Sequence, residues 1–552
     1  MTVNQPLCIK FISEANNHYI YDTESNEILQ VSHLMYSMVD NYAELKSFDC
    51  ESYLDHSNSA CCPSEEVLKT LKVLWKCGVL KPHIPLQTSK IKGIGLPHSR
   101  YSLEYFVAEY SRMLTLELTQ KCNLNCIYCC YGKYYSSHRS HGKETISCDV
   151  AEKAIRDHLD AKHSGKTITF YGGEPLLEFG LLRHLIEYAK NYCNEIGIEE
   201  PSFSFTTNGT LLNEDIIHFI VKHNISVFIS LDGDCKSHDS NRIFLDNRTG
   251  SFHVVFKNIK LFIELYPSYS RRGIALTLTA CTDIRKTNQL LREISAYFPV
   301  IFASAVSDNH VLGVQSIMEG CEVSKCSGLS SQAKVPPVCP DFLNWTPERL
   351  RNYNNCWSEF YATLLLSHEQ AQSEWPLLFE IFVSRYRKIH QRDIFRLPCM
   401  RIPCDCIPGA VRTYCTTQGY YFPCEKVENT SLLCIGDVWS GIDSEKVEGL
   451  INSMSELVDC NNCKAKRLCS ICPNDISERN FSFGSHMQNH CQSIVSDVER
   501  VLREYMGLIE KKPDLFESIQ WGTVCDDWLR EVYFIINDNK EICKKCANYT
   551  NV

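Results

Sequence analysis

One short segment of the sequence, KCNLNCIYCC, holds cysteines whose spacing suits a metal centre. Cys122, Cys126 and Cys129 follow the pattern C-x3-C-x2-C, so one loop could present all three thiolates. Such a set can bind three irons of a [4Fe–4S] cube and leave the fourth iron open for another ligand. A zinc knuckle is the alternative interpretation. We expect the adjacent Cys130 to be a packed thiol outside this pattern.

A second set of cysteines is concentrated near the C-terminal end. Cys406, Gly419 and Cys424 form a C-x12-G-x4-C pattern, and Cys491 ends the series. Between them, a C-x2-C-x5-C-x2-C quartet consists of Cys460, Cys463, Cys469 and Cys472. Taken alone, this quartet is compatible with a zinc ribbon. Clustered cysteines in a large chain more often bind metal, while scattered reduced thiols and disulfides are the other two interpretations.

The composition of the 552-residue chain limits its class of function. Its 31 cysteines stand beside 44% hydrophobic and 22% charged residues, which is ordinary for a globular protein. A net charge of −10 without a long basic run argues against nucleic acid as a partner. The first residues do not resemble a signal peptide, and no run of about 18 apolar residues predicts a membrane span. We therefore expect a cytoplasmic protein.

Small and polar residues follow several predicted strands between the two cysteine groups. In YGGEP, Gly172 and Gly173 let a ligand approach the backbone closely because they lack Cβ atoms, and Glu174 can accept a hydrogen bond from an ammonium group. Ser230 and Asp232, in SLDG, project to the same side by strand alternation. The segment TTNG also ends a strand. Ordinary turn chemistry at strand ends is the alternative interpretation of these last two segments.

These motifs need a scaffold that brings strand ends together, and residues 111–306 have the pattern of one. Short apolar runs alternate there with helical stretches, which predicts parallel β-α units with right-handed crossovers. The expected strands are residues 113–119, 167–173, 203–209, 226–233, 273–280 and 300–306. Six such units indicate an α/β fold of the partial (β/α)6 TIM-barrel type, with its site at the C-terminal ends of the strands.

The remaining segments are expected to form smaller units around this barrel. Residues 1–90 have the size of a winged-helix-like module, with strands at 8–12 and 18–22 and helices at 33–42 and 64–78. The cysteine-dense region has little periodicity, so we expect metal to organise it. The boundaries are a linker at 91–110, a bridging region at 307–395, a cysteine-rich domain at 396–495 and a helical tail at 496–552.

The cysteine loop after the first barrel strand, with GGEP one β-α unit later, resembles the radical S-adenosylmethionine (SAM) superfamily. The resemblance implies that SAM chelates the open iron, and that one electron splits SAM into methionine and a 5′-deoxyadenosyl radical. It implies that Tyr128 lies beside the adenine and that the Gly-Gly-Glu turn holds the SAM amine. Ser230 and Asp232 would lie near the ribose or the substrate. Arg242 would reach the SAM carboxylate, with a surface ion pair as the alternative.

The C-terminal pattern resembles the SPASM domain, which binds two auxiliary [4Fe–4S] clusters and brings the implied total to three. The implied ligands of the first auxiliary cluster are Cys406, Cys424 and Cys472. Those of the second are Cys460, Cys463, Cys469 and Cys491. The commonest version of the pattern has three residues between the last pair of the quartet, whereas this chain has two. Cys399 or Cys404 could complete the first auxiliary cluster; otherwise its open iron could hold a substrate thiolate.

Local segments such as CNNCKAKRLCSICP resemble maturases that install thioether links in Cys-rich ribosomal peptides, the ranthipeptides and sactipeptides. This implies that residues 1–90 bind the leader of a precursor peptide as an added strand. A structural cap on the barrel is the alternative for that module. A flavodoxin or ferredoxin would act as the external one-electron donor. Glu425 matches a position where related enzymes carry an acid near the substrate, and a solvated glutamate is the alternative.

Other reactions stay open at this point. The same cofactors could serve C–C crosslinking, epimerisation or oxidation of a residue to formylglycine. A metal-stabilised binding scaffold without catalysis is the alternative from a different class. Cys543 and Cys546 form an isolated C-x2-C pair, for which a shared metal or redox role is one interpretation.

Overall fold

The residues that a computed structural model describes make up most of the chain. These are residues 6–39, 70, 73–81, 111–129, 131–132, 141–161, 165–246, 248–305, 345–392, 408–410, 412–460, 462–469, 471–475, 484–519 and 521. Several predictions fall outside them: the linker at 91–110 and the roles of Cys130, Cys399, Cys404, Cys406, Cys543 and Cys546.

Six parallel strands form the centre of the molecule, in the order of the sequence. They are β4 (Met113–Thr119), β5 (Thr167–Gly172), β6 (Ser202–Thr207), β7 (Ser226–Ser230), β8 (Arg272–Leu278) and β9 (Val300–Ala305). Each lies within a few residues of a predicted strand, so the predicted α/β class is confirmed. Side chains such as Phe170, Phe205 and Ile229 are fully buried between the sheet and its helices, as expected for parallel strands covered by crossover helices.

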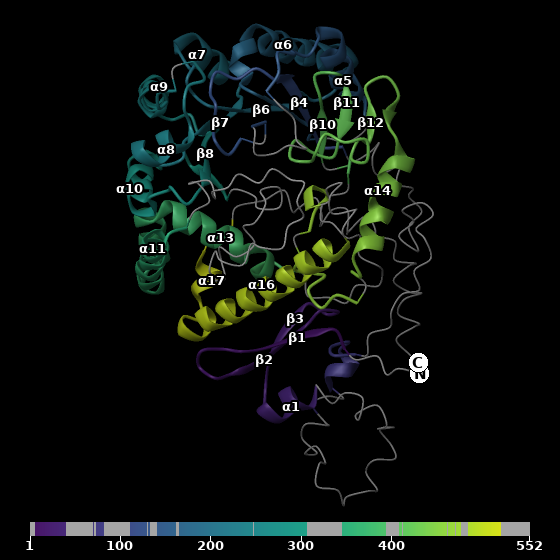
Figure 1. The fold of residues 1–552 in the computed structure, drawn as a ribbon, viewed down its shortest axis with the longest axis vertical. Coiled ribbons are helices and arrows are strands. Elements are labelled where there is room, and N and C mark those ends of the chain that lie inside the picture. Colours follow the sequence, from purple (N-terminus) through teal and green to yellow (C-terminus); the bar gives the residue numbers. More distant parts are fainter. Residues whose placement is uncertain are drawn as a thin grey trace, which may run out of the picture.

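Helices cover the outer side of this sheet (Figure 1). They are α5 (Cys148–Asp160), η2 (Pro175–Glu178), α6 (Phe179–Ile196), α7 (Glu214–Lys222), α8 (Cys235–Asn241), α9 (Phe252–Leu265) and α10 (Ile284–Ile294). Several begin at side chains that cap the first turn: Ser147 accepts from the Val150 amide and Asn213 from the Ile216 amide. The sequence therefore fixes where each crossover helix starts and where the preceding loop ends.

The cysteine-rich region extends the same sheet instead of forming a separate one. β10 (Arg412–Cys415) pairs in parallel with β4, and three antiparallel strands continue beyond it. These are β11 (Tyr420–Phe422), β12 (Gly436–Asp437) and β13 (Gly441–Ile442), which complete a ten-stranded sheet. A parallel pairing across about three hundred residues has no local turn signal, so sequence patterns could not reveal it.

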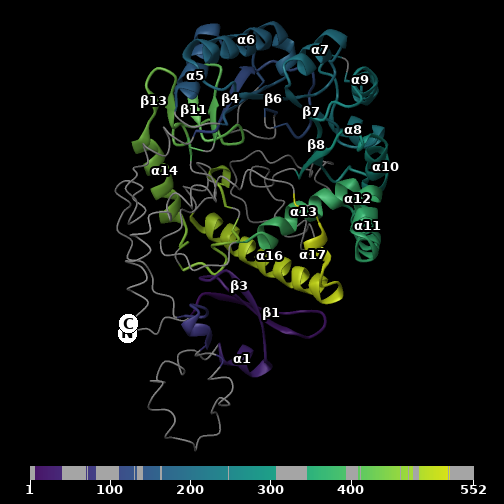
Figure 2. The ribbon, with the colours of Figure 1, turned by 180° about the vertical axis from the view of Figure 1, so that it is seen from behind.

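Helices bridge the barrel and the cysteine-rich region (Figures 1 and 2). The part of 307–395 that is described is helical, although its sequence is poorly patterned. It contains α11 (Pro347–Leu366), α12 (His368–Glu374) and α13 (Pro376–His390). Further along lie α14 (Ser444–Leu457), η6 (Pro473–Asp475), α16 (Gly484–Lys511) and α17 (Leu515–Ser518). The long helix α16 begins before the predicted tail boundary at 496, so Cys491 is helical.

The N-terminal module contains a three-stranded antiparallel sheet and a short helix. These are β1 (Cys8–Ile12), β2 (His18–Asp22), β3 (Glu27–Val31) and α1 (His33–Met38). The two predicted strands are confirmed and a third was missed, whereas the winged-helix class stays a prediction because residues 40–69 are outside the described part. β1 packs on α16, and Glu510 of that helix accepts hydrogen bonds from Ser13 Oγ, Asn17 Nδ2 and Tyr19 OH at 2.7–2.8 Å.

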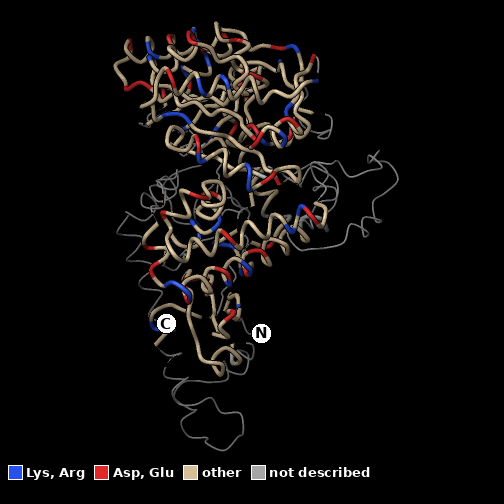
Figure 3. The backbone as a smooth tube through the Cα atoms, turned by 90° about the vertical axis from the view of Figure 1, so that its left-hand side faces the viewer, with Lys and Arg blue, Asp and Glu red and all other residues tan. Residues whose placement is uncertain are grey.

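Charged positions of both signs are interspersed along the described backbone (Figure 3). The expected absence of a nucleic-acid partner stays a prediction. None of the described helices is long and apolar enough to cross a membrane.

Candidate cofactor-binding sites

The first cysteine loop follows β4 at the C-terminal edge of the parallel strands. Its backbone is tied to the end of α8, since the Asn125 amide donates to Ile243 O at 2.8 Å and the Ile127 amide to Asn241 O at 3.0 Å. Cys122, Cys126 and Cys129 are all half-buried there. Burial raises the pKa of the Cys126 thiol to about 12 and that of Cys122 further.

The Gly-Gly-Glu turn lies directly against this loop. The Gly173 amide donates to Thr119 O at 2.7 Å, and the Glu174 amide donates to Lys121 O at 2.8 Å. A Cβ atom at Gly172 would come within 2.2 Å of Thr119 O, and one at Gly173 within 2.1 Å of Lys121 O. The glycines are therefore required by the approach of two backbones, a role in addition to the predicted approach of a ligand.

Glu174 is almost fully buried beside Cys122, where it links three elements. Its carboxylate accepts from Thr207 Oγ1 at 2.7 Å, from the Asn208 amide at 2.7 Å and from the Leu176 amide at 3.1 Å. Burial raises its pKa, and these hydrogen bonds oppose the increase. The carboxylate thus fixes the ends of β5 and β6 around the cysteine loop, and its role toward the SAM amine stays a prediction.

Tyr128, Asp232 and Arg242 come together, although they lie in separate segments of the sequence. Asp232 is fully buried; it accepts from Arg242 Nε at 2.9 Å, from the Thr277 amide at 3.0 Å and from the Tyr128 hydroxyl. Ser230 is buried at the end of β7, two residues before Asp232. Arg242 therefore forms a buried ion pair, which differs from the surface pair considered as the alternative.

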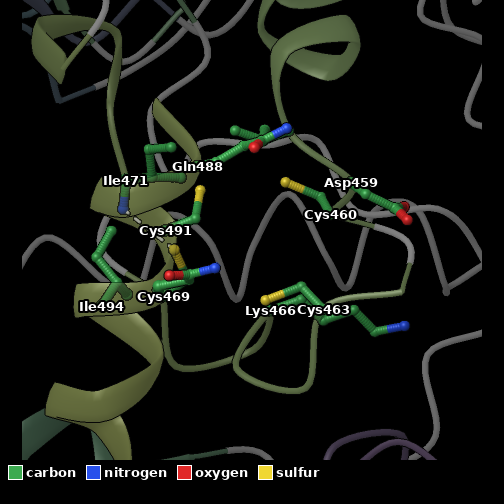
Figure 4. A pocket seen from close by; sticks show the side chains of 11 residues that line it. Asp459, Cys460, Cys463, Lys466, Cys469, Ile471, Gln488, Cys491 and Ile494 are labelled. Carbon is green, nitrogen blue, oxygen red and sulfur yellow. Dashed lines mark hydrogen bonds between the residues drawn. The ribbon is translucent and has the colours of Figure 1, made fainter. Parts of the chain in front are cut away.

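Four cysteines of the C-terminal region line one cavity of about 280 Å³. They are Cys460, Cys463, Cys469 and Cys491, the set assigned to the second auxiliary cluster. Figure 4 shows their side chains around a shared space, with Cys491 contributed by α16 and the others by the preceding loop. Burial, together with the nearby Cys469 and Cys463 thiols, raises the pKa of Cys491 to about 11.

The spacing of these thiols bears on the choice between zinc and an iron–sulfur cube. Among the described residues, no three His, Cys, Asp or Glu side chains converge closely enough to hold one metal ion. Zinc needs its sulfur ligands to converge on one point at about 2.3 Å, whereas a cube binds each thiolate at a different iron. Cys460, Cys463, Cys469 and Cys491 border one cavity, and the assignment of a cube instead of zinc to them stays a prediction.

The first auxiliary set is only partly described. Cys424 and Cys472 are half-buried, and Cys472 is not among the residues that line the four-cysteine cavity. Its allocation to the first auxiliary cluster stays a prediction. Glu425 is not a freely solvated glutamate, because both its carboxylate oxygens lie 2.9 Å from Arg412 Nη1. Its proposed role as a base therefore competes with an ion pair.

Three further residues near these sites were not assigned from the sequence. Asn208, in the TTNG segment, directs its Nδ2 atom toward Cys122 Sγ at 4.0 Å, and strand-end alternation could have identified it. The His141 side chain hydrogen-bonds Cys129, but no motif surrounds this histidine. Lys466 lines the four-cysteine cavity and pairs with Glu24 of the N-terminal module, a contact between distant segments that no local pattern indicates.

Comparison with known proteins shows what the segment around the first cysteine loop is similar to. The model of the radical SAM superfamily matches residues 116–277. The cysteine-type anaerobic sulfatase-maturating enzyme of Clostridium novyi (strain NT) is 33% identical over 160 residues, 29% of this chain and 42% of the relative. The radical SAM cyclopropyl synthase TigE of Paramaledivibacter caminithermalis is 30% identical over 140 residues, 24% of this chain and 29% of the relative.

The chain thus spans less than half the length of these two relatives. A solved structure, that of histidine-tagged anSMEcpe with bound AdoMet, covers 74% of this chain and 94% of its own, with 19% identity and a TM-score of 0.50. That likeness shows a shared fold. The chain contains a radical SAM domain with homology to anaerobic sulfatase-maturating enzymes and TigE, and such a domain implies a [4Fe–4S] cluster and SAM.

Proposed function

We propose that this protein is a radical SAM enzyme that modifies a Cys-rich precursor peptide by forming thioether crosslinks. The observation that carries the proposal is the direct contact between the N-terminal module and the loop that bears the second auxiliary set. Thr23 Oγ1 donates to Lys464 O, and Arg467 Nη1 donates to Glu24 O at 3.1 Å. The module that we expect to bind peptide is therefore fixed to the loop of a cysteine site in the same molecule.

We expect three clusters with distinct roles, although one proposed ligand, Cys406, lies outside the described residues. Cys122, Cys126 and Cys129 would hold the SAM cluster, and the four-cysteine cavity would hold the second auxiliary cluster. Cys424 and Cys472, with Cys406, would hold the first. When bound, the SAM cluster and SAM supply a radical that abstracts hydrogen from a peptide carbon. The chain itself positions these groups: Glu174 fixes two strand ends, and the Tyr128–Asp232–Arg242 network fixes the loop.

The N-terminal module offers an edge for a leader peptide. In the described part of the chain β3 pairs only with β2, so its other edge has backbone groups directed away from the sheet. The partly buried side chains of Leu29 and Val31 pack with the core of the module. A leader peptide would therefore bind to the backbone groups at the edge of β3 and not to an apolar face. An extended peptide can add to such an edge through main-chain hydrogen bonds. An external flavodoxin or ferredoxin would supply electrons.

A second function is favoured by the relatives themselves. Homology to a cysteine-type anaerobic sulfatase-maturating enzyme supports oxidation of one residue in a peptide or protein, and homology to TigE supports closure of a carbon ring. Both reactions would use the same radical SAM domain. They differ from thioether formation either in the fate of the substrate thiols or, where a cysteine is oxidised and its sulfur leaves, in a mass loss larger than two hydrogens.

The test is incubation of the reduced protein with SAM and a Cys-rich precursor, followed by alkylation and mass spectrometry. Each thioether should lower the precursor mass by about 2 Da and remove one alkylatable thiol, because a bound sulfur is no longer a nucleophile. Mass loss with every thiol still alkylatable would reject the thioether and favour carbon crosslinking or ring closure. An unchanged mass in ordinary water, with one deuterium gained per altered residue in D2O, would indicate epimerisation.

A further inference from the structure

The thiols of the first cysteine loop each face one nitrogen-bearing side chain from a different part of the barrel. Arg242 Nη1 lies 3.8 Å from Cys126 Sγ, and Asn208 Nδ2 lies 4.0 Å from Cys122 Sγ. Cys129 hydrogen-bonds the His141 side chain. Sulfur accepts hydrogen bonds at longer distances than oxygen does, so these contacts direct N–H groups at the ligand atoms.

Arg242 is held so that only one of its nitrogen groups faces the loop. Its Nε atom donates to Asp232 Oδ2 at 2.9 Å, and its Nη2 atom donates to Asp232 Oδ1 at 3.3 Å. The guanidinium also lies 5.4 Å from the centre of the Tyr128 ring. With two nitrogens used by Asp232, the remaining Nη1 group faces Cys126. The expected reach of Arg242 to the SAM carboxylate stays a prediction.

Asn208 is held with comparable precision. Its Oδ1 atom accepts from the Thr210 amide at 3.0 Å and from Thr210 Oγ1 at 2.6 Å, which fixes the identity of its amide nitrogen. That nitrogen donates one hydrogen to Asn123 Oδ1 at 2.8 Å, and the other is directed toward Cys122. The side chain is also 7% exposed, so water competes little for this hydrogen.

We propose that Arg242 and Asn208 donate hydrogen bonds to the cluster thiolates and thereby raise the reduction potential of the SAM cluster. The inference rests on the proposed binding of that cluster by Cys122, Cys126 and Cys129. Hydrogen bonds to cluster sulfurs and nearby charge are recognised determinants of cluster potential. On reduction, one electron passes from a low-potential donor protein to the cluster, no bond changes, and the added negative charge is stabilised by both donors.

The test is a redox titration of the full protein without SAM or peptide, with the reduced SAM cluster followed by electron paramagnetic resonance. The signal that changes when SAM is added afterwards identifies that cluster. We expect Arg242→Met to shift its midpoint to more negative potential. The double variant R242M/D232N, which removes the pair without changing net charge, should shift it in the same direction by less. Arg285→Met breaks an exposed ion pair with Glu359 and should leave the midpoint unchanged.

An unchanged midpoint in Arg242→Met at full iron content, with weakened SAM binding, would overturn the inference and assign Arg242 to SAM. If Arg242→Met loses the cluster, Asn208→Leu decides: a shift to more negative potential supports the inference and an unchanged midpoint rejects it. The precursor assay tests the proposed reaction separately, since the midpoint is measured without peptide. Absence of any SAM-sensitive signal in the unsubstituted protein would instead reject the cluster assignment.

Discussion

The carboxylate of Glu24 lies 2.7 Å from the Nζ atom of Lys466, although the two residues are 442 positions apart in the chain. Both side chains are about one-tenth exposed. Glu24 belongs to the turn between β2 and β3, and Lys466 lies between Cys463 and Cys469 in the loop that borders the four-cysteine cavity. The turn of the N-terminal module therefore holds in place the loop that borders the four-cysteine cavity.

Breaking the Glu24–Lys466 pair should destabilise both the N-terminal module and the loop that borders the four-cysteine cavity. We expect Glu24→Gln to lower the free energy of unfolding by about 3 kcal/mol, because it removes the carboxylate charge that lies 2.7 Å from the largely buried Lys466 ammonium. The variant should also lose iron faster under a chelator. Asp157→Asn, at the exposed pair with Lys153, is the control and should cost less than about 1 kcal/mol. Equal unfolding free energies for the two variants would contradict the prediction.

The first cysteine loop should account for SAM cleavage and for one cluster only. Replacement of Cys122, Cys126 and Cys129 by Ala should abolish 5′-deoxyadenosine formation and reduce iron from about twelve to about eight atoms per chain. Cys148→Ala, which removes an exposed thiol at the start of α5, should change neither quantity. Formation of 5′-deoxyadenosine by the triple variant under anaerobic, reducing conditions would refute the assignment.

The four-cysteine cavity should be separable from SAM cleavage. Cys491→Ala removes the thiol that α16 contributes, so we expect loss of iron from that site, retained 5′-deoxyadenosine formation without peptide, and greatly reduced peptide modification. Cys193→Ala removes a thiol of α6 that is fully buried in the hydrophobic core. This variant should retain all its iron. Full iron content in Cys491→Ala would show that the cavity does not hold a cluster through this residue.

The free edge of β3 should be needed for the precursor but not for the cofactors. Backbone N–H groups alternate in direction along a strand, so one of Leu29 and Gln30 directs its N–H away from β2. A proline at that residue should weaken precursor binding at least about tenfold, or 1.4 kcal/mol. Binding is measured by titration with a labelled leader peptide, and iron content is the control. Deletion of residues 1–90 is less informative, because it also removes Glu24 from Lys466.

The buried His158 should make the protein less stable in acid. Burial, with Lys166 nearby, lowers its pKa from 6.5 to about 3, so between these values the unfolded chain binds a proton that the folded chain does not. Its contribution to stability is complete above pH 6.5 and is lost as the pH falls. His158 alone should contribute about 2 kcal/mol to the drop in the free energy of unfolding between pH 7 and pH 5.

Comparison of two variants by denaturation at several pH values checks this contribution. His158→Leu should make the free energy of unfolding depend less on pH between pH 7 and pH 5. His184→Gln, at a half-exposed side chain, should leave that dependence unchanged. If the free energy of unfolding changes equally with pH in both variants, a group other than His158 causes the change.

Local patterns predicted the barrel strands and the three-cysteine loop because each depends on residues close in sequence. β4, for example, matches its predicted range of 113–119, and its buried run needs no distant partner to be recognised. The parallel pairing of β10 with β4 could not be predicted, since nothing near Arg412 specifies its partner. The contact of Arg242 with Asp232 was missed for a related reason: a ten-residue separation across a turn leaves side-chain direction undetermined.

The hydrogen bond from Ser13 to Glu510 joins residues 497 positions apart, which sets a constraint on biosynthesis. A ribosome adds about 5–20 residues each second, so β1 waits roughly 25–100 seconds before α16 exists to cover it. During that interval the tyrosine and serine hydroxyls that later meet Glu510 face solvent or a chaperone. Iron could therefore reach Cys463 and Cys469 before the last segment is released. At that stage the loop already contacts the N-terminal module, but α16 has not yet closed the cavity with Cys491.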